Sequence, residues 1–477
     1  MSGATVVISP AGYSVASGFY TDQFASYATR LVDPSITSDV AGGTTLTRTW
    51  NGSSASYQVY KTLQYAVNDW LTQGGRRVGL LNATTYTLSA DLAFPSATSL
   101  SDSARVVLMG DPSSTETNMA RIDLSSAFRV VPTKNGTRDY VTLRKVWFDG
   151  NVTTAVETGW VGFGDFGDTT ASYNALVVEF CKFSNIRQPD NAKNIGAIKF
   201  GQSTGTPPAT GPVVRNNKFL SCYAADINNS NTVAIMLEVS GNTVGPGKLD
   251  INRNEFSGCA TAFFSKVTNG TGADFYRNVT HDGGRFLVLG NAGASVTDSG
   301  TIAVYLNLVY GMSAGAYAVD SALFSPGQGQ GLWVYQNTIA EDVVGGLALT
   351  SFNDCRAHSN AILTSGGGGI VKLKYRTGYS GTTIWTQVDR NAYYADANWT
   401  LGATNYSSLS SWRAATGTPL AGGLNQDANS FFISSLSTEF TNVAGRDYSL
   451  TPGSALRGAG VGGVNIGYDW TDCGPGW

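Results

Sequence analysis

The chain has 477 residues, of which 42% are hydrophobic and 14% are charged, and its formal net charge at pH 7 is −3. This apolar content and small net charge exclude a largely disordered chain and a strongly basic surface for nucleic acid. The sequence also lacks a run of about 18 apolar residues, so no membrane insertion is predicted.

Residues 1–55 are predicted to form an N-terminal docking or capping segment. They are rich in small polar residues, with a short apolar run at 6–8 and an aromatic stretch at 20–27. The first residues, Met1 to Ala4, lack the basic start and apolar stretch of a secretory signal. We therefore expect a protein that never used such a signal, or one from which the signal has been removed.

The segment that follows predicts one amphipathic helix, which ends at Gly74 and Gly75. Laid across the open end of a solenoid, such a helix would cover exposed core and unpaired strand edges. The apolar residues at helical spacing are Tyr60, Leu63, Ala66, Val67, Trp70 and Leu71.

Down the middle of the chain, an asparagine-centred motif recurs every 23 to 37 residues. A period in this range marks a solenoid. Each motif follows a short run with alternating apolar residues, so the repeating unit is strand and turn rather than helix. Stacked in register, the asparagines would form a ladder of amide hydrogen bonds. They are Asn217, Asn254, Asn278, Asn307, Asn337 and Asn360.

Strand-like segments flank this repeat on both sides. Before it come residues 85–88 (TYTL), 106–111 (VVLMGD) and 140–151 (YVTLRKVWFDGN). After it come residues 391–394 (NAYY), 409–417 (LSSWRAATG), 425–430 (NQDANS), 447–454 (DYSLTPGS) and 464–469 (VNIGYD). Together with the helix, these segments resemble the opening and closing parts of the right-handed parallel β-helix proteins of the pectin-lyase-like superfamily.

The resemblance extends over roughly residues 60–470. It implies an all-β fold, a right-handed parallel β-helix solenoid over residues 56–400 with an N-terminal capping helix. Residues 401–477 would form an irregular C-terminal cap. The superfamily includes lyases, hydrolases, epimerases, phage tailspikes and inert structural modules, so the resemblance implies a fold rather than an activity.

Five cysteines are present without a C-x-x-C pair or a histidine cluster, which argues against a cysteine metal site. Cys222 and Cys259 each lie five residues after a ladder asparagine. We therefore expect buried free thiols on adjacent coils, with a disulfide as the alternative.

Residues at equal offsets from the asparagines form columns, because coils stack about 4.8 Å apart. Two places before the asparagine, alternation predicts that Tyr276, Tyr305 and Tyr335 point outward, with Trp333 one outward position away. Exposed rings offer flat apolar faces and wet phenol edges. We predict that this strip binds a polysaccharide substrate; a subunit interface, as in a homotrimer, and simple strand filling are the alternatives.

Four places before the asparagine, Asp250 and Asp274 occupy adjacent rungs. Carboxylates one rung apart would lie near the roughly 5 Å separation of retaining glycosidases, and repulsion would raise one pKa towards that of a general acid. The pair could instead bind Ca²⁺, which takes oxygen ligands. A purely structural role is the third interpretation, because Asp often begins a strand beside a turn. No other cofactor or metal is predicted.

A lyase would need a base for the proton α to a uronate carboxyl group and a cation that neutralises this group. His281 and Arg285, in the polar turn 280–285, complete the predicted catalytic set with Asp250 and Asp274. A local hydrogen bond between His281 and the next residue is the simpler interpretation. The lyase candidates near the aspartates are Lys248, Lys266, Tyr276, His281 and Arg285.

Three functions follow from these patterns. The first is an extracellular virion-surface protein, of the tailspike or head-decoration type, that engages host glycans and docks on the particle through its N-terminal segment. The second is a secreted polysaccharide lyase or glycosidase, which the resemblance supports and the lack of a recognisable catalytic motif opposes. The third is a purely structural or interaction module, because few charged residues lie on the predicted outer face.

Overall fold

The computed structural model describes most of the chain between residues 28 and 475. Described are residues 28–475 without 51–52, 72–76, 82, 95–100, 102–104, 112–113, 126–128, 133–139, 151–160, 164–174, 188–194, 202–209, 224–225, 228–231, 239–246, 268–271, 292–299, 314–316, 322–328, 341–344, 350–351, 365–370, 376–383, 396–397, 402–403, 416–426 and 469–473. Within them, no helix is long and apolar enough to span a bilayer.

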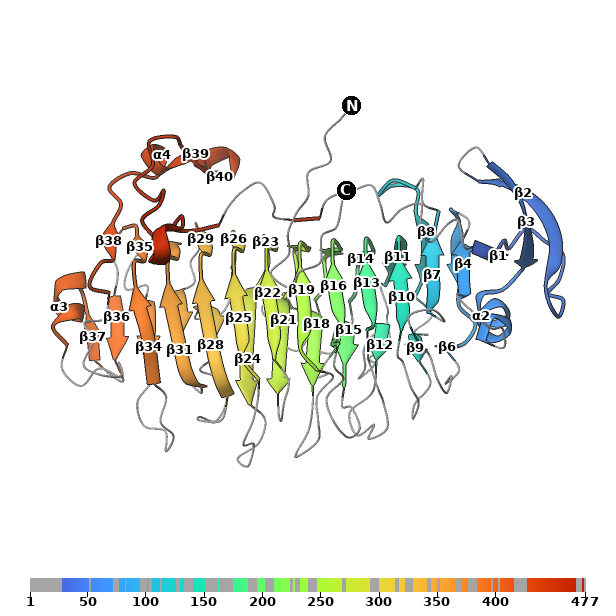
Figure 1. Cartoon of the computed structure of the whole chain (residues 1–477), viewed down its shortest axis with the longest axis horizontal. Coiled ribbons are helices and arrows are strands. Elements are labelled where there is room, and N and C mark those ends of the chain that lie inside the picture. The colour runs from blue at the N-terminus through green and yellow to red at the C-terminus, as the bar shows by residue number, and fades with distance from the viewer. Residues whose placement is uncertain are drawn as a thin grey trace.

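Three long sheets form the walls of a solenoid (Figure 1). Sheet 1 has the strand order β2 (Thr44–Trp50), β3 (Ser53–Tyr60), β1 (Ala28–Val32), β4 (Arg77–Leu81), β7 (Val106–Gly110), β10 (Val141–Arg144), β13 (Val177–Glu179), β16 (Val213–Arg215), β19 (Leu249–Asn252), β22 (Ala273–Tyr276), β25 (Ile302–Tyr305), β28 (Gly329–Tyr335), β31 (Phe352–His358) and β34 (Ile384–Asp389).

Sheet 2 contains β5 (Thr85–Thr87), β8 (Ala120–Asp123), β11 (Val146–Asp149), β14 (Lys182–Ser184), β17 (Lys218–Leu220), β20 (Glu255–Ser257), β23 (Val279–His281), β26 (Leu308–Tyr310), β29 (Thr338–Ala340), β32 (Ala361–Leu363), β35 (Ala392–Tyr393) and β38 (Phe431–Phe432). Sheet 3 contains β6 (Leu92–Phe94), β9 (Val130–Pro132), β12 (Val161–Phe163), β15 (Ile195–Phe200), β18 (Thr232–Glu238), β21 (Thr261–Val267), β24 (Arg285–Asn291), β27 (Tyr317–Asp320), β30 (Gly345–Ala348), β33 (Val371–Tyr375), β36 (Asn398–Leu401) and β37 (Thr404–Tyr406).

Each coil contributes one strand to each sheet, and neighbouring coils pair in parallel register. Antiparallel pairing within the three sheets is confined, among the described strands, to the ends, where β2 pairs with β3 and β36 with β37. The predicted all-β, right-handed parallel β-helix is therefore confirmed.

The corner between sheets 1 and 2 carries the predicted ladder. Asn278, which is fully buried, donates from Nδ2 to Asn307 Oδ1 at 3.0 Å and to the carbonyl of Ile251 at 3.1 Å. Its own Oδ1 accepts from the backbone and side-chain nitrogens of Asn254 at 2.9 and 3.0 Å. The pattern runs from Asn217 to Asn391, so each asparagine satisfies backbone groups that the turn would otherwise leave unpaired.

The residue before each ladder asparagine has a left-handed backbone, and none of these residues is glycine. Arg253, Arg277 and Leu306 have φ values of 53°, 56° and 55°. Such a conformation costs roughly 1–2 kcal/mol for a residue with a Cβ. The side-chain bonds of the ladder offset this cost, because they hold the corner in a single conformation.

The core lies between the three sheets. Consecutive strands of sheet 2 place Phe148, Phe183, Phe219 and Phe256 above one another, with ring centroids 4.8 to 5.0 Å apart. Cys222 and Cys259 are buried free thiols, as predicted, and burial raises the pKa of Cys222.

The N-terminal end is closed by the predicted helix, α2 (Leu63–Leu71), whose Leu63, Ala66 and Val67 enter the core. The predicted docking segment is only partly described, and residues 1–27 lie outside the described residues. From Ala28 onward the chain already belongs to sheet 1, because β1 pairs with both β3 and β4. The predicted boundary at residue 55 falls inside β3.

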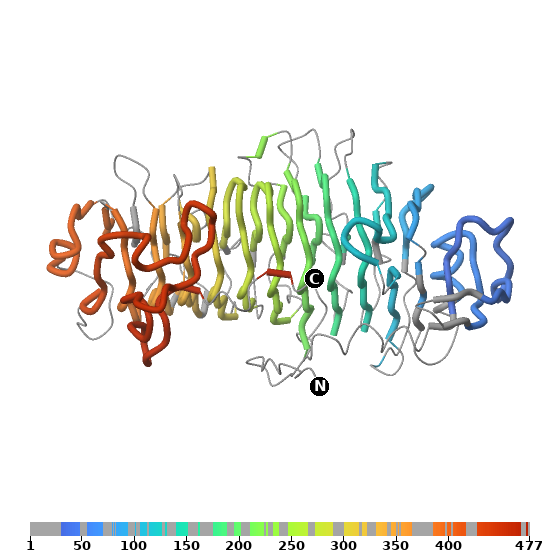
Figure 2. The backbone as a smooth tube through the Cα atoms, turned by 90° about the horizontal axis from the view of Figure 1, so that it is seen from above, coloured from blue at the N-terminus to red at the C-terminus, as the bar shows by residue number. Residues whose placement is uncertain are grey.

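The C-terminal end has two parts. The helix α3 (Leu409–Arg413) closes the last coil, where Trp412 Nε1 donates to the buried Asp427 at 2.8 Å. The chain then turns back along the outside of sheet 2 through α4 (Leu436–Glu439), β39 (Phe440–Asn442), η3 (Val443–Gly445), β40 (Asp447–Leu450) and η4 (Val461–Gly463). Figures 1 and 2 show this returning segment in red beside the shaft, so the C-terminal part covers a side as well as an end.

Candidate functional site

Asp250 and Asp274 lie on the outer face of sheet 1, on neighbouring strands β19 and β22. The strand register pairs them directly, and it pairs the inward neighbours Ile251 and Phe275 in the same way. Ile251 and Phe275 are fully buried, whereas both aspartates are half-buried. The two carboxyl groups therefore occupy adjacent rungs, as predicted, about 4.8 Å apart along the stacking direction.

Asp250 has polar neighbours on its own rung and on the next. The amide of Asn252 donates to Asp250 Oδ1 at 2.7 Å, and Tyr276 on the next rung lies close enough to interact with the carboxyl group. Burial, followed by the nearby charge of Asp274, raises the pKa of Asp250 despite these contacts. A carboxyl group that keeps its proton to higher pH can act as a general acid.

Asp274 has a cationic partner. Lys248 Nζ lies 2.7 Å from Asp274 Oδ2, and the lysine side chain is 59% exposed. The pair adds little to stability, because solvent screens exposed charges. Its chemical consequence is greater, since one carboxyl group with a raised pKa stands beside a second that contacts an ammonium group. Glycoside hydrolysis uses two carboxyl groups, of which one donates a proton and the other is ionised.

The tyrosine strip differs from the prediction. Tyr276, Tyr305 and Tyr335 do share one column, but their rings stack on one another, with centroids 4.8 Å apart and planes within 5°. Tyr276 and Tyr305 are only 5% and 8% exposed. The prediction that these rings offer open faces is therefore wrong, because rung spacing nearly equals the distance for ring stacking.

Trp333 lies in the next column and is also covered. The guanidinium carbon of Arg356 sits 4.3 Å from the centre of the Trp333 ring, and Trp333 Nε1 donates to Asp354 at 2.9 Å. A Cβ at position 331 would come within 2.9 Å of that nitrogen, so Gly331 makes room for the indole. The prediction of an open indole face is thus wrong for the face that the arginine occupies.

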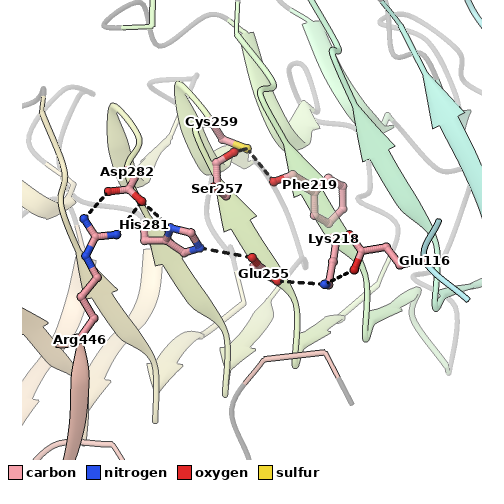
Figure 3. A network of polar contacts seen from close by, with 9 residues as sticks. All are labelled: Glu116, Lys218, Phe219, Glu255, Ser257, Cys259, His281, Asp282 and Arg446. Carbon is pink, nitrogen blue, oxygen red and sulfur yellow. Dashed lines mark hydrogen bonds and ion pairs between the residues drawn. The ribbon is translucent and has the colours of Figure 1, made fainter. Parts of the chain in front are cut away.

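His281 and Arg285 do not join the aspartates. His281 ends β23 in sheet 2, and Arg285 begins β24 in sheet 3. Because Asp250 and Asp274 belong to sheet 1, the four residues of the predicted catalytic set lie on three different walls. His281 instead contacts Glu255 and Asp282, in the network that Figure 3 shows. Of the lyase candidates, Lys248 and Tyr276 contact the aspartates, and Lys266 lies in β21 of sheet 3.

A Ca²⁺ ion at Asp250 and Asp274 fits these contacts poorly. Calcium takes about six to eight oxygen ligands, whereas one of these carboxyl groups accepts from Asn252 and the other contacts Lys248. Among the described residues, no group of three or more His, Cys, Asp or Glu side chains is arranged to bind a metal. Calcium binding at this pair stays a prediction.

The sequence reasoning missed a charged ladder on the same face. Arg144, Glu179 and Arg215 occupy consecutive rungs of the tyrosine column, and Glu179 contacts Arg215 at 2.8 Å and Arg144 more closely. The column of Tyr276 thus continues towards the N-terminus as an ion-pair network. The asparagine motif does not reveal this network, because Val146 and Cys181 take the place of the ladder asparagine on the coils of Arg144 and Glu179.

No protein-family model matches the sequence, and no curated protein is significantly similar to it. Among the solved structures with a similar fold are two lyases of the PL6 family. One is the PL6 family alginate lyase AlyGC, with 11% identity and a TM-score of 0.40 over 73% of this chain and 55% of that protein. The other is a PL6 family polysaccharide lyase from Pseudopedobacter saltans, with 11% identity and a TM-score of 0.47 over 87% of this chain and 98% of that one.

Proposed function

We propose that this protein is an extracellular glycan-acting β-helix that binds polysaccharide on the outer face of sheet 1 and hydrolyses it at Asp250 and Asp274. One observation carries the proposal. Two carboxyl groups face outward on adjacent strands, and burial raises the pKa of Asp250 while Lys248 contacts Asp274. Strands about 4.8 Å apart put such groups near the roughly 5 Å separation of the two carboxyl groups in retaining glycosidases.

In the proposed reaction, Asp250 donates its proton to the glycosidic oxygen as the bond to the leaving sugar breaks. Asp274 forms a bond to the anomeric carbon, and water then displaces Asp274 while returning a proton to Asp250. Tyr276 lies beside Asp250 on the next rung, and Lys248 orients Asp274. Because the acid must be protonated, activity should fall as pH rises through the pKa of Asp250.

The test is incubation of the protein with a panel of polysaccharides, followed by measurement of reducing ends, unsaturated uronates and retention on immobilised glycan. We expect new reducing ends without unsaturated products. Asp250→Asn and Asp274→Asn should each lower the rate about 10²- to 10⁴-fold. Asp282→Asn, a matched change on sheet 2, should leave the rate unchanged.

Three other results would each contradict part of this proposal. Unsaturated uronates would show elimination by a lyase, with Lys248 and Tyr276 as its nearest candidate groups. Retention on glycan without products would support glycan binding and contradict hydrolysis. If the protein is not retained on glycan and forms no products with any polysaccharide of the panel, glycan action is overturned altogether. The structural or interaction module is then the remaining function.

Attachment to a virion or another particle is a separate part of the proposal. The body of the solenoid begins at β1, so residues 1–27 precede its first described strand. Deleting residues 1–27 should leave the β-helix folded and abolish attachment to the particle. A deletion variant that still attaches would contradict the tailspike or head-decoration role, and the mass of the intact protein in solution would test the predicted trimer.

A further inference from the structure

The N-terminal end of the solenoid has one extended sheet and two sheet edges. Figure 1 shows β1, β2, β3 and α2 in blue at this end. The first complete coil contributes β4 to sheet 1, β5 to sheet 2 and β6 to sheet 3. Sheet 1 continues beyond β4 through β1, whereas β5 and β6 are the last described strands of their sheets. The outer backbone groups of β5 and β6 therefore need partners other than a described strand.

The edge of sheet 3 is closed by a side chain. Leu92 N donates to the carbonyl of Arg129 on the neighbouring coil at 2.8 Å. Parallel pairing therefore turns the backbone groups of Ala93, the next residue, away from the sheet. Gln64 on α2 pairs with both groups, because its Oε1 accepts from Ala93 N at 2.9 Å and its Nε2 donates to the Ala93 carbonyl at 3.0 Å. One glutamine side chain thus takes the place of a neighbouring strand.

The edge of sheet 2 has no such partner. Arg121 N donates to the carbonyl of Thr84 at 2.8 Å, which fixes the pairing of β8 with β5. This pairing turns the backbone N–H and C=O groups of Thr85 and Thr87 outward. Within the described part of the chain these four groups have no hydrogen-bond partner, and both threonines are exposed. Unlike the groups of Ala93, they are available to a further strand.

A groove of about 300 Å³ lies beside this edge. Its lining includes the first turn of α2 and residues 85–92, so the groove follows the open side of β5. Leu63, Leu88 and Leu92 contribute apolar side chains to it. A site for an added strand needs unpaired backbone groups and space for side chains, and the edge of β5 offers both.

The chain that follows β1 does not fill this position. In the next coil the chain passes from its sheet 1 strand, β4, directly to its sheet 2 strand, β5. After β1 it takes another course, in which Asp39 accepts from the backbone nitrogens of Lys61 and Thr62 at 2.6 and 3.1 Å, just before α2. It then returns to sheet 1 as β2. The described chain therefore leaves the strand position beside β5 open.

We propose that the outer edge of β5 is a strand-docking site and that residues 5–9 of this chain (TVVIS) occupy it. Residues 5–8 are all β-branched, the type that strands favour. The described chain begins at Ala28 in β1, which pairs with β4 and so lies level with the open position. Residues 10–27, if extended, reach up to about 60 Å, whereas a typical strand is only about 17–20 Å long. The linker is therefore long enough to cross from β1 to the edge of β5.

The experiment is hydrogen–deuterium exchange at the amides of Thr85 and Thr87 in the full-length protein. Docking pairs these N–H groups, so they should exchange about tenfold more slowly than in a variant that lacks residues 1–9, the factor expected from about one net hydrogen bond. The double variant Val6→Pro/Val7→Pro keeps the length of the chain and removes a backbone donor whichever way the docked strand faces. It should exchange as fast as the deletion variant.

Two controls belong to the same experiment. Val15→Pro makes the same kind of change outside the proposed strand and should keep the slow exchange of the full-length protein. The amide of Ala93, which Gln64 already pairs, should exchange alike in all variants. A synthetic peptide of residues 3–10, added to the deletion variant, should restore slow exchange at Thr85 and Thr87 in a saturable way.

Two results would overturn the inference. One is equal exchange of Thr85 and Thr87 in the full-length protein and in the double proline variant. The other is slow exchange that requires high protein concentration and accompanies a dimer mass, because a second copy would then supply the strand. Both readouts are independent of polysaccharide hydrolysis and of particle attachment, so the docked strand can fail while the proposed function stands, and the reverse.

Discussion

Two outer faces of the solenoid carry the same aromatic arrangement with opposite electrostatic results. On sheet 1, His358 stacks on Tyr335 with centroids 5.2 Å apart and planes 9° apart. On sheet 2, His281 stacks on Tyr310 at 5.1 Å and 13°. These are the two histidines of the chain. Yet the pKa of His358 is lowered to about 4, whereas the pKa of His281 is raised.

The difference comes from the charged neighbours rather than from the rings. His281 lies between two carboxylates, at 2.9 and 3.3 Å. His358 is half-buried beside the charge of Arg356, and its ring nitrogen lies 3.3 Å from the hydroxyl of Ser359. The stacking of the rings therefore does not determine the protonation state of either histidine. Residues in the neighbouring columns determine it.

The largest expected effect on the free energy of unfolding comes from a substitution in the asparagine ladder, at the corner between sheets 1 and 2. Asn278→Leu removes the partners of the Asn254 nitrogens and the Ile251 carbonyl, all inside the protein. Each buried group left unpaired costs about 1 to 3 kcal/mol, so we expect a loss of about 3 kcal/mol or more in the free energy of unfolding. Denaturant unfolding followed by circular dichroism measures it.

A control for this prediction stands in the same column. Cys181 occupies the ladder position one coil before Asn217 and is an apolar rung in the natural sequence. Cys181→Val should therefore cost less than about 1 kcal/mol. If Asn278→Leu is as mild as Cys181→Val, the ladder bonds do not stabilise the corner.

The second prediction concerns the stack on sheet 1. Tyr305 lies between Tyr276 and Tyr335, so Tyr305→Ala removes two ring contacts and opens a gap, at a cost of about 2 to 4 kcal/mol. Tyr305→Phe keeps the stack and should be nearly neutral. Thermal unfolding of both variants, with glycan retention measured on the folded protein, separates a structural stack from a binding surface. An unchanged melting temperature in Tyr305→Ala would contradict the stacked geometry.

The sequence predicted the columns of this fold well, because they depend on a repeated asparagine and strict strand alternation. Counting back from Asn254 and Asn278 paired Asp250 with Asp274 correctly. The same count paired Tyr305 with Tyr335. Backbone register is a periodic property, so a periodic sequence reveals it.

The environment of the outward side chains was not predictable in the same way. Whether Tyr305 is open or covered depends on the ring of the next rung, and stacked tyrosines cover one another. His281 and Arg285 are four residues apart, yet the turn at Gly283 and Gly284 sends them to different sheets. The returning C-terminal segment has no repeat, so nothing in the sequence indicated that Arg446 would reach Asp282.

The smallest expected effect is the pH dependence that the two histidines add to stability. Burial, with the charge of Arg356, lowers the pKa of His358 to about 4, below its unfolded value of about 6.5. Protons therefore bind the unfolded chain more readily, and the stability present above about pH 6.5 is lost as pH falls towards 4. The free energy of unfolding at pH 7, 5.5 and 4 should decline less steeply in His358→Gln than in the wild-type protein.

His281 should act in the opposite direction, because its pKa is raised and its contribution is lost only as pH rises. His281→Gln should therefore flatten the profile on the alkaline side and leave the decline between pH 6.5 and 4 in place. Since the chain has two histidines, labelled-histidine NMR spectra should contain two signals that titrate on opposite sides of about pH 6.5. If both signals titrate on the same side, the neighbouring columns do not set the charge of these rings, and the contrast between the two faces fails.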